Sequence, residues 1–176
     1  MNKGIYLLIS VVLLVACSGN SDKKKPTRAE VAKYKESLVG IHKEIVKIQT
    51  DSIQKFVDSA GWKMQKTPTG LWISIIEDKA GEAAKQGNEV YISYRTSLMN
   101  GKQCYCSDSL GYKHFICGQG GVEAGLEEAV LSMSKGDKAR IIMPSHLAYG
   151  VAGDFKCVPR LAILICEIEM MDISKQ

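Results

Sequence analysis

A strict alternation of side chains in the second half of the chain limits its fold more than any other feature. Within residues 90–98 every second position carries an apolar residue, a tyrosine or a threonine: Val90, Ile92, Tyr94, Thr96 and Leu98. A period of two indicates a β-strand with one buried face. Asn100 and Gly101 follow shortly after, and this dipeptide is a strong signal for a tight hairpin. The region therefore predicts an antiparallel sheet.

Shorter patterns around that strand complete a domain. Four further stretches read as strands: residues 71–75, 114–117, 139–143 and 161–170. From Val122 onward, apolar residues fall on one face of a predicted helix that ends near Gly136. Roughly five mostly antiparallel strands around one helix are typical of the α+β class.

Residues 28–61 form a predicted helical arm before the sheet. Its apolar residues recur at spacings of three and four: Val31, Tyr34, Leu38, Ile41, Ile45 and Ile48. The polar residues 50–52 are expected to interrupt it, and a second short helix then ends at residues 60–61. Either the arm packs on its own domain, or this seam joins two copies in a homodimer. Gly40 weakens a free coiled coil, which favours packing on the chain's own domain.

The first twenty residues look like a bacterial lipoprotein leader. Lys3 precedes an apolar run over residues 5–16, which is too short to span a bilayer. The run leads into Leu-Val-Ala-Cys at residues 14–17, which resembles a lipobox, so Cys17 is the expected lipidation site. Lipid chains there would anchor the protein to a membrane of the bacterial cell envelope. Ser18 resembles the signal for sorting to the outer membrane, facing the periplasm.

Charge and motifs argue against most other functions. A net charge of +4 without a basic stripe argues against nucleic-acid binding. The three histidines are far apart in the sequence, and neither a phosphate-binding loop nor a Gly-x-Ser-x-Gly motif occurs. We therefore expect no metal and no cofactor. A binding module, or an enzyme that needs no nucleophile, is left.

Five cysteines follow Cys17: Cys104, Cys106, Cys117, Cys157 and Cys166. Disulfides are allowed outside the cytoplasm, but an odd number leaves at least one cysteine free or paired between chains. The Cys-x-Cys spacing at residues 104–106 matches neither a zinc knuckle nor a thioredoxin motif. We interpret most of these cysteines as buried, unpaired apolar filling.

Residues 87–173 carry, in order and in one register, the short motifs of a known family. They include Val-Tyr-Ile-Ser-Tyr at 90–94, Gly-Leu-Glu-Glu-Ala at 125–129, Met-Ser-Lys-Gly-Asp at 133–137 and Leu-Ala-Tyr-Gly at 147–150. This half of the chain resembles the FKBP-type peptidyl-prolyl cis-trans isomerases. The resemblance implies an FKBP-like half-wrapped antiparallel sheet around one helix, here preceded by the N-terminal helical arm.

The resemblance also implies a function. These enzymes help proteins fold by speeding rotation about X-Pro bonds, and for this chain the implied substrates are X-Pro segments of exported polypeptides. The barrier is about 18–20 kcal/mol, and a dry pocket with a few donors lowers it by favouring the twisted amide. The predicted organisation is a signal peptide over 1–16, a flexible tether over 17–27, the arm over 28–61 and an FKBP-like domain over 62–176.

By resemblance, two tyrosines are the catalytic candidates. Tyr94 matches the family's pocket tyrosine, and Tyr149 matches the tyrosine whose hydroxyl binds a substrate carbonyl. The matching substrate-binding positions are Phe115, Val122, Val158 and, through its backbone N–H, Glu123. The positions that depart from the family are Cys104, Tyr105, Leu126 and Cys166.

The departures leave alternatives open. Cys104 and Cys166 replace family aromatics that face each other across the pocket, so they either form a disulfide or mark a degraded pocket. The chain is then an active isomerase, or a catalytically weak or silent binding module with the same fold. Thiol chemistry at Cys104 and Cys106 is a weaker third reading, because neither is expected near a histidine or a helix N-terminus that would lower its pKa.

Overall fold

The structure is a computed structural model that describes residue 25 and residues 27–174. The predicted signal peptide, the lipidation site Cys17 and most of the tether lie outside the described residues. By its internal contacts the chain divides into two units, Met1–Gly40 and Ile41–Gln176. The second unit contains the whole sheet and every predicted pocket residue.

The helical arm is one helix, α2, which spans Arg28–Ala60. It starts with a capping box, in which the Glu30 N–H donates to Thr27 Oγ1 and the Thr27 N–H donates to Glu30 Oε2. The predicted interruption at residues 50–52 is wrong. The Ser52 hydroxyl donates back to the Ile48 carbonyl at 2.8 Å, and Ile53 and Val57 are buried directly after it. Packing of the next turns therefore outweighs the weak helix propensity of three polar residues.

Seven strands form one antiparallel sheet in the order β1-β2-β6-β7-β3-β4, with β5 also paired to β3. Their bounds are β1 Gln65–Lys66, β2 Trp72–Glu77, β3 Glu89–Leu98, β4 Gln103–Cys106, β5 Lys113–Ile116, β6 Lys138–Met143 and β7 Leu164–Ser174. Three short helices lie between them: α3 Ser107–Leu110, α4 Ala124–Val130 and η1 Ser145–Leu147. The predicted hairpin joins β3 to β4, with Gly101 at φ 85°.

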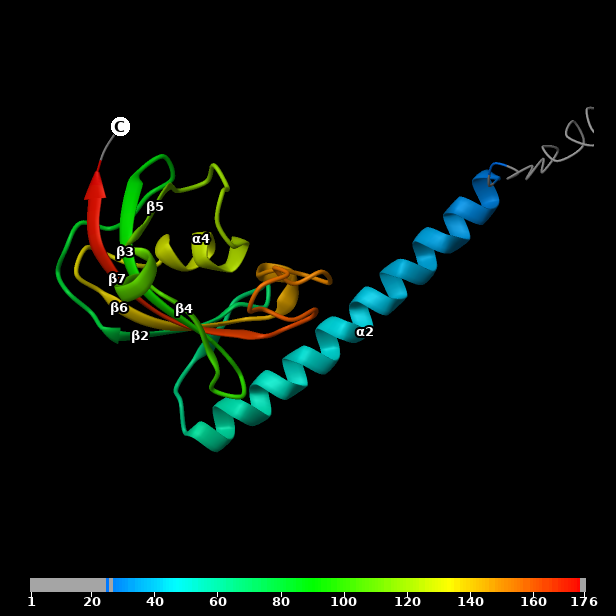
Figure 1. The fold of residues 1–176 in the computed structure, drawn as a ribbon, viewed down its shortest axis with the longest axis horizontal. Coiled ribbons are helices and arrows are strands. Elements are labelled where there is room, and N and C mark those ends of the chain that lie inside the picture. Colours follow the sequence, from blue (N-terminus) through cyan, green and yellow to red (C-terminus); the bar gives the residue numbers. More distant parts are fainter. Residues whose placement is uncertain (1–24, 26, 175–176) are drawn as a thin grey trace, which may run out of the picture. The chain divides into compact units, whose positions relative to one another are not determined.

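Helix α4 lies inside the curve of the sheet, and the main core fills the space between them (Figure 1). Leu126, Ala129 and Val130 of α4 are buried there against inward-facing residues of β2, β3, β6 and β7. Gly125 makes the close approach possible, since an added Cβ would stand 2.8 Å from Met143 Cγ. The prediction of an α+β fold with one helix inside a curled antiparallel sheet is confirmed.

The opposite face of the sheet carries a second, smaller core. Ile53 and Val57 of α2 pack there with Trp72 of β2 and Ile142 of β6. The buried side chain of Gln49 accepts from the Ser145 N–H at 2.9 Å and donates to the Leu161 carbonyl at 2.9 Å. These contacts fix the last turns of α2 to η1 and to the end of the 148–163 loop.

Two expectations for the backbone need correction. The predicted seam of the arm is mostly exposed, at Val31, Tyr34, Leu38, Ile41 and Ile48. Within the unit Ile41–Gln176, the C-terminal turns of α2 pack on the chain's own domain through Ile53 and Val57. The last strand begins at Leu164 rather than at Leu161, because Leu161 has a φ of 56°, which an extended strand cannot contain.

Candidate active site

A cavity of about 590 Å³ opens at one end of the main core. Its wall combines β3, β4, α3, β5 and the 148–163 loop: Tyr94, Gln103, Cys104, Tyr105, Cys106, Ser109, Leu110, Lys113, Tyr149, Asp154 and Lys156. Four of the residues predicted for the site, Tyr94, Cys104, Tyr105 and Tyr149, therefore line one cavity. Tyr94, Cys104 and Tyr105 come from strands of the sheet, and Tyr149 comes from the 148–163 loop.

The hydroxyl of Tyr149 is engaged by a carboxylate. It donates to Glu123 Oε1 at 2.5 Å, and Lys113 Nζ lies 2.7 Å from Glu123 Oε2. Burial pushes the pKa of Glu123 upward, but the charge of Lys113 and the hydrogen bonds from Lys113 and Tyr149 outweigh it and hold the pKa below its usual range. Burial and the Glu123 carboxylate raise the pKa of Tyr149. At neutral pH the site therefore holds a carboxylate and a protonated phenol.

Lys113 also reaches the second catalytic candidate. Its Nζ lies 5.0 Å from the centre of the Tyr94 ring, within range of a cation–π contact. Burial is the main cause that raises the pKa of Tyr94. One lysine thus contacts both the ring of Tyr94 and the carboxylate that holds Tyr149.

Tyr105 donates its hydroxyl to Asp154 Oδ2 on the opposite rim. The other oxygen of Asp154 accepts from three consecutive backbone N–H groups, those of Lys156, Cys157 and Val158, at 2.8–3.0 Å. Burial opposes ionisation of Asp154, but the hydrogen bonds from Tyr105 and from these three N–H groups outweigh it and lower the pKa of Asp154. A carboxylate from the loop therefore lies beside Tyr105, one of the positions that depart from the family pattern.

Two of the cysteines form a disulfide, between Cys104 and Cys157. The alternative Cys104–Cys166 disulfide is therefore wrong. Cys166 is buried on β7 with its sulfur 3.3 Å from Thr96 Oγ1, and burial raises its pKa to about 11. Cys106, Cys117 and Cys166 are free and buried, so the interpretation as apolar filling holds for these three and fails for Cys104 and Cys157.

Cys106 corrects a second expectation. It is the N-cap residue of α3, so it does lie at a helix N-terminus. Hydrogen bonding to Ser109 lowers its pKa. With Cys104 in a disulfide, only Cys106 of the Cys-x-Cys pair carries a free thiol.

The other predicted pocket residues lie deeper or to one side. Phe115, Leu126, Val158 and Cys166 are buried in the main core and are not part of the cavity wall. Val122 and Glu123 line an adjoining cavity of about 550 Å³ that shares Lys113 and Tyr149 with the first. The Lys113–Glu123 ion pair thus lies where the two cavities meet, so the pocket that the resemblance implies to be dry has a charged pair in its wall.

Lys113 and Asp154 are site residues that the sequence analysis missed. A signal existed for Lys113, because it lies two residues before Phe115 on β5, and the period of two places both side chains on the same face. No local pattern pairs Asp154 with Tyr105, since 49 positions separate them.

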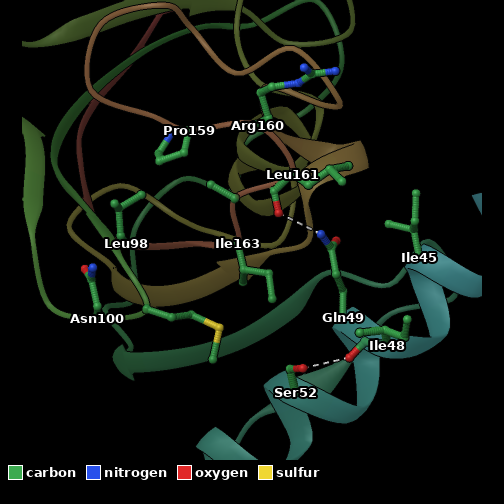
Figure 2. A pocket seen from close by; sticks show the side chains of 12 residues that line it. Ile45, Ile48, Gln49, Ser52, Leu98, Asn100, Pro159, Arg160, Leu161 and Ile163 are labelled. Atoms are coloured by element: carbon green, nitrogen blue, oxygen red, sulfur yellow. Dashed lines mark hydrogen bonds between the residues drawn. The ribbon is translucent and has the colours of Figure 1, made fainter.

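A second, apolar cavity of about 530 Å³ lies between α2 and the loop before β7 (Figure 2). Ile45 and Ile48 of α2 face Leu161 and Ile163 across it, and the Gln49 amide bridges the two sides at the Leu161 carbonyl. None of the predicted site residues lines this cavity. Its wall holds one charged side chain, that of Arg160, so it offers less chemistry than the first cavity.

Over residue 25 and residues 27–174, no helix has the length and apolar character needed to cross a bilayer. No cluster of three or more histidine, cysteine or acidic side chains within this part of the chain is arranged to hold a metal ion.

Comparison with known proteins places the chain in a family. Residues 80–171 match the family model described as FKBP-type peptidyl-prolyl cis-trans isomerase. The isomerase FkpA of Escherichia coli (strain K12) is 31% identical over 121 residues, which are 69% of this chain and 43% of FkpA. The isomerase FKBP11 of Bos taurus is 35% identical over 98 residues, which are 56% of this chain and 48% of FKBP11. The chain thus spans less than half the length of these two relatives.

Solved structures share the fold. The crystal structure of FkpA from Escherichia coli has a TM-score of 0.64 at 24% identity, covering 99% of this chain and 84% of that one. The crystal structure of AtFKBP13 has a TM-score of 0.60 at 26% identity, covering 62% of this chain and 98% of that one. Because the family model matches just over half of its residues, the chain belongs to the family of FKBP-type peptidyl-prolyl cis-trans isomerases.

Proposed function

We propose that this protein is a peptidyl-prolyl cis-trans isomerase that acts on X-Pro segments of exported polypeptides as a folding helper. The observation that carries the proposal is the position of Tyr94 and Tyr149. In a chain of this family, the two tyrosines reach the same cavity from β3 and from the 148–163 loop.

Rotation about the prolyl bond breaks amide resonance and requires no covalent step. The cavity can favour the twisted amide because its phenol groups donate hydrogen bonds and part of its wall excludes water. The raised pKa values of Tyr94 and Tyr149 keep both phenols protonated at neutral pH, so each is able to donate. Neither a nucleophile nor a metal is needed for this reaction.

The test is the relaxation of cis to trans prolyl bonds in Leu-Pro and Phe-Pro tetrapeptides, with and without reductant. We expect micromolar protein to accelerate relaxation, and Tyr149→Phe to slow it. Relaxation at the rate of buffer alone would favour the alternative, a binding module with the same fold. The ion pair of Lys113 and Glu123 in the cavity wall supports this alternative. Binding of the same peptides without acceleration of their cis-to-trans relaxation would establish it.

We also propose that the protein is anchored by lipid on Cys17, in the bacterial cell envelope at the outer membrane facing the periplasm. The supporting features are the apolar run over residues 5–16, the Leu-Val-Ala-Cys sequence and Ser18. Labelled palmitate fed to cells should enter the protein, and Cys17→Ser should lose both the label and the association with membranes. Retention of label in that variant would exclude Cys17 as the anchor.

We further propose that the arm joins two copies in a homodimer. The support is the exposed apolar seam on α2, which includes Tyr34, Leu38 and Ile41. Sedimentation equilibrium should give twice the chain mass, and Leu38→Lys should halve it. Ile76→Lys on β2 is a matched control, since the two side chains are similarly exposed (47% and 52%). A monomer mass for the unmodified chain would contradict the proposal.

A further inference from the structure

The hydroxyl that the proposed function assigns to the substrate already has an acceptor inside the chain. Tyr149 Oη donates to Glu123 Oε1 at 2.5 Å. A phenol carries one proton and can donate it to one acceptor at a time. A substrate carbonyl at this cavity therefore competes with Glu123 for the same proton.

Glu123 is a strong competitor. Its side chain is only 9% exposed, and both of its oxygens accept from Lys113 Nζ, at 3.0 and 2.7 Å. Hydrogen bonds to an ionised acceptor are roughly twice as strong as those between neutral groups. The carbonyl of a prolyl substrate is neutral, so it is the weaker acceptor for Tyr149.

The lysine that holds Glu123 is itself fixed within the cavity. Lys113 extends from β5, and its Nζ lies over the ring of Tyr94 at 5.0 Å. A continuous chain of contacts then runs from Tyr94 through Lys113 and Glu123 to Tyr149. These contacts hold the Glu123 carboxylate beside the Tyr149 hydroxyl.

We propose that Glu123, held by Lys113, is a positioning residue that withholds the Tyr149 hydroxyl from the substrate and so limits the isomerase rate. The proposal rests on the isomerase function proposed above. On this proposal, a low isomerase rate is caused by the hydrogen bond between Tyr149 and Glu123 rather than by the loss of the family's aromatic residues. It also predicts that activity rises when a charged pair is removed from the site.

The experiment replaces the pair by apolar side chains of similar size, in Lys113→Met/Glu123→Leu, so that no charge is left unpaired. We expect kcat/KM for the Leu-Pro and Phe-Pro tetrapeptides to rise about tenfold, which corresponds to about 1.4 kcal/mol of transition-state stabilisation. Glu123→Gln, which keeps the size and removes the charge, should show a smaller rise. The control is Lys135→Met/Asp172→Asn, which removes an exposed ion pair on another part of the domain and should leave kcat/KM unchanged.

A cycle with Tyr149→Phe separates positioning from a structural effect. In the unmodified chain this substitution should lower kcat/KM by about twofold, because the hydroxyl is withheld. In the Lys113→Met/Glu123→Leu background it should lower kcat/KM by about tenfold, because the hydroxyl then reaches the substrate. The ultraviolet titration of the phenols should move in parallel, with the pKa of Tyr149 falling toward its ordinary value once Glu123 is gone.

The outcomes distinguish this inference from the proposed function. An unmodified chain that accelerates relaxation, with folded apolar variants that are no faster, overturns the role of Glu123 and leaves the isomerase function standing. An unchanged cost of Tyr149→Phe in the two backgrounds overturns the role of Glu123 as well. If no variant accelerates relaxation, the isomerase function itself fails. If the apolar variants are faster than an unmodified chain that is slow or inactive, the result supports both the role of Glu123 and the isomerase function.

Discussion

Two tyrosines in the candidate active site donate to carboxylates, yet the two pairs are built in different ways. In the Tyr149–Glu123 pair, the carboxylate is neutralised by one side chain, that of Lys113. In the Tyr105–Asp154 pair, three consecutive backbone N–H groups donate to one oxygen of the carboxylate, and Tyr105 donates to the other. The first pair depends mainly on side chains, and the second is built into the backbone of the 148–163 loop.

A covalent link reinforces this difference. Cys104 and Cys157 are sequence neighbours of the second pair, so the disulfide joins the same two segments as the hydrogen bond from Tyr105 to Asp154. No such link lies at Glu123. Substitutions in the second pair should therefore cost folding stability, whereas substitutions in the first should mainly change what the cavity binds.

The largest effect should come from the disulfide. Cys104→Ser/Cys157→Ser opens a loop whose ends lie 53 positions apart, which in the chain-entropy treatment lowers the free energy of unfolding by about 4 kcal/mol. Urea unfolding of both proteins measures this change in the free energy of unfolding. Reductant should lower the stability of the unmodified chain to that of the double variant and leave the variant unchanged. Equal stability of both proteins without reductant would show that the disulfide does not form in solution.

The Asp154 carboxylate should come next. Asp154→Ala leaves three backbone N–H groups without their acceptor, so we expect the free energy of unfolding to fall by about 2 kcal/mol. Tyr105→Phe is the matched control, because it removes one donor and leaves the backbone contacts intact. That control should cost about 1 kcal/mol or less. If Tyr105→Phe costs as much as Asp154→Ala, the loop does not depend on the backbone contacts.

The same contrast explains what the sequence could and could not predict. Period-two alternation placed Tyr94 on the inner face of β3, and short motifs located Tyr149. The partners of these residues depend on how loops fold over the sheet, and the periodicity of a sequence does not predict the path of a loop. Cys104 pairs with Cys157 because the 148–163 loop returns to β4, and the sequence alone gave no such pairing.

Local rules also failed where tertiary packing opposed them. The polar residues 50–52 favour a helix end in isolation, but Ile53 and Val57 bury against the back of the sheet and keep α2 continuous. Glu123 was assigned only through its backbone N–H, since nothing near it in the sequence showed that Lys113 would face it from β5. In both cases the decisive contact comes from a segment that is distant in sequence.

The smallest effect, and the sharpest contrast between the pairs, is in the acid titration. Both carboxyl groups have lowered pKa values, so each contributes stability that is present above its unfolded pKa and is lost as the pH falls through its folded pKa. Burial is the largest opposing influence on Glu123, and Lys113 is the largest favourable one. In Lys113→Met, burial should therefore raise the pKa of Glu123 above its ordinary value, and the variant should gain rather than lose stability as the pH falls from this raised folded pKa to the unfolded pKa. For Asp154 in Tyr105→Phe, the three backbone donors should keep the pKa low and preserve the usual loss in acid. Carboxyl carbon chemical shifts followed by NMR against pH measure both values, and a Glu123 pKa that stays low without Lys113 would show that the two pairs are held in the same way.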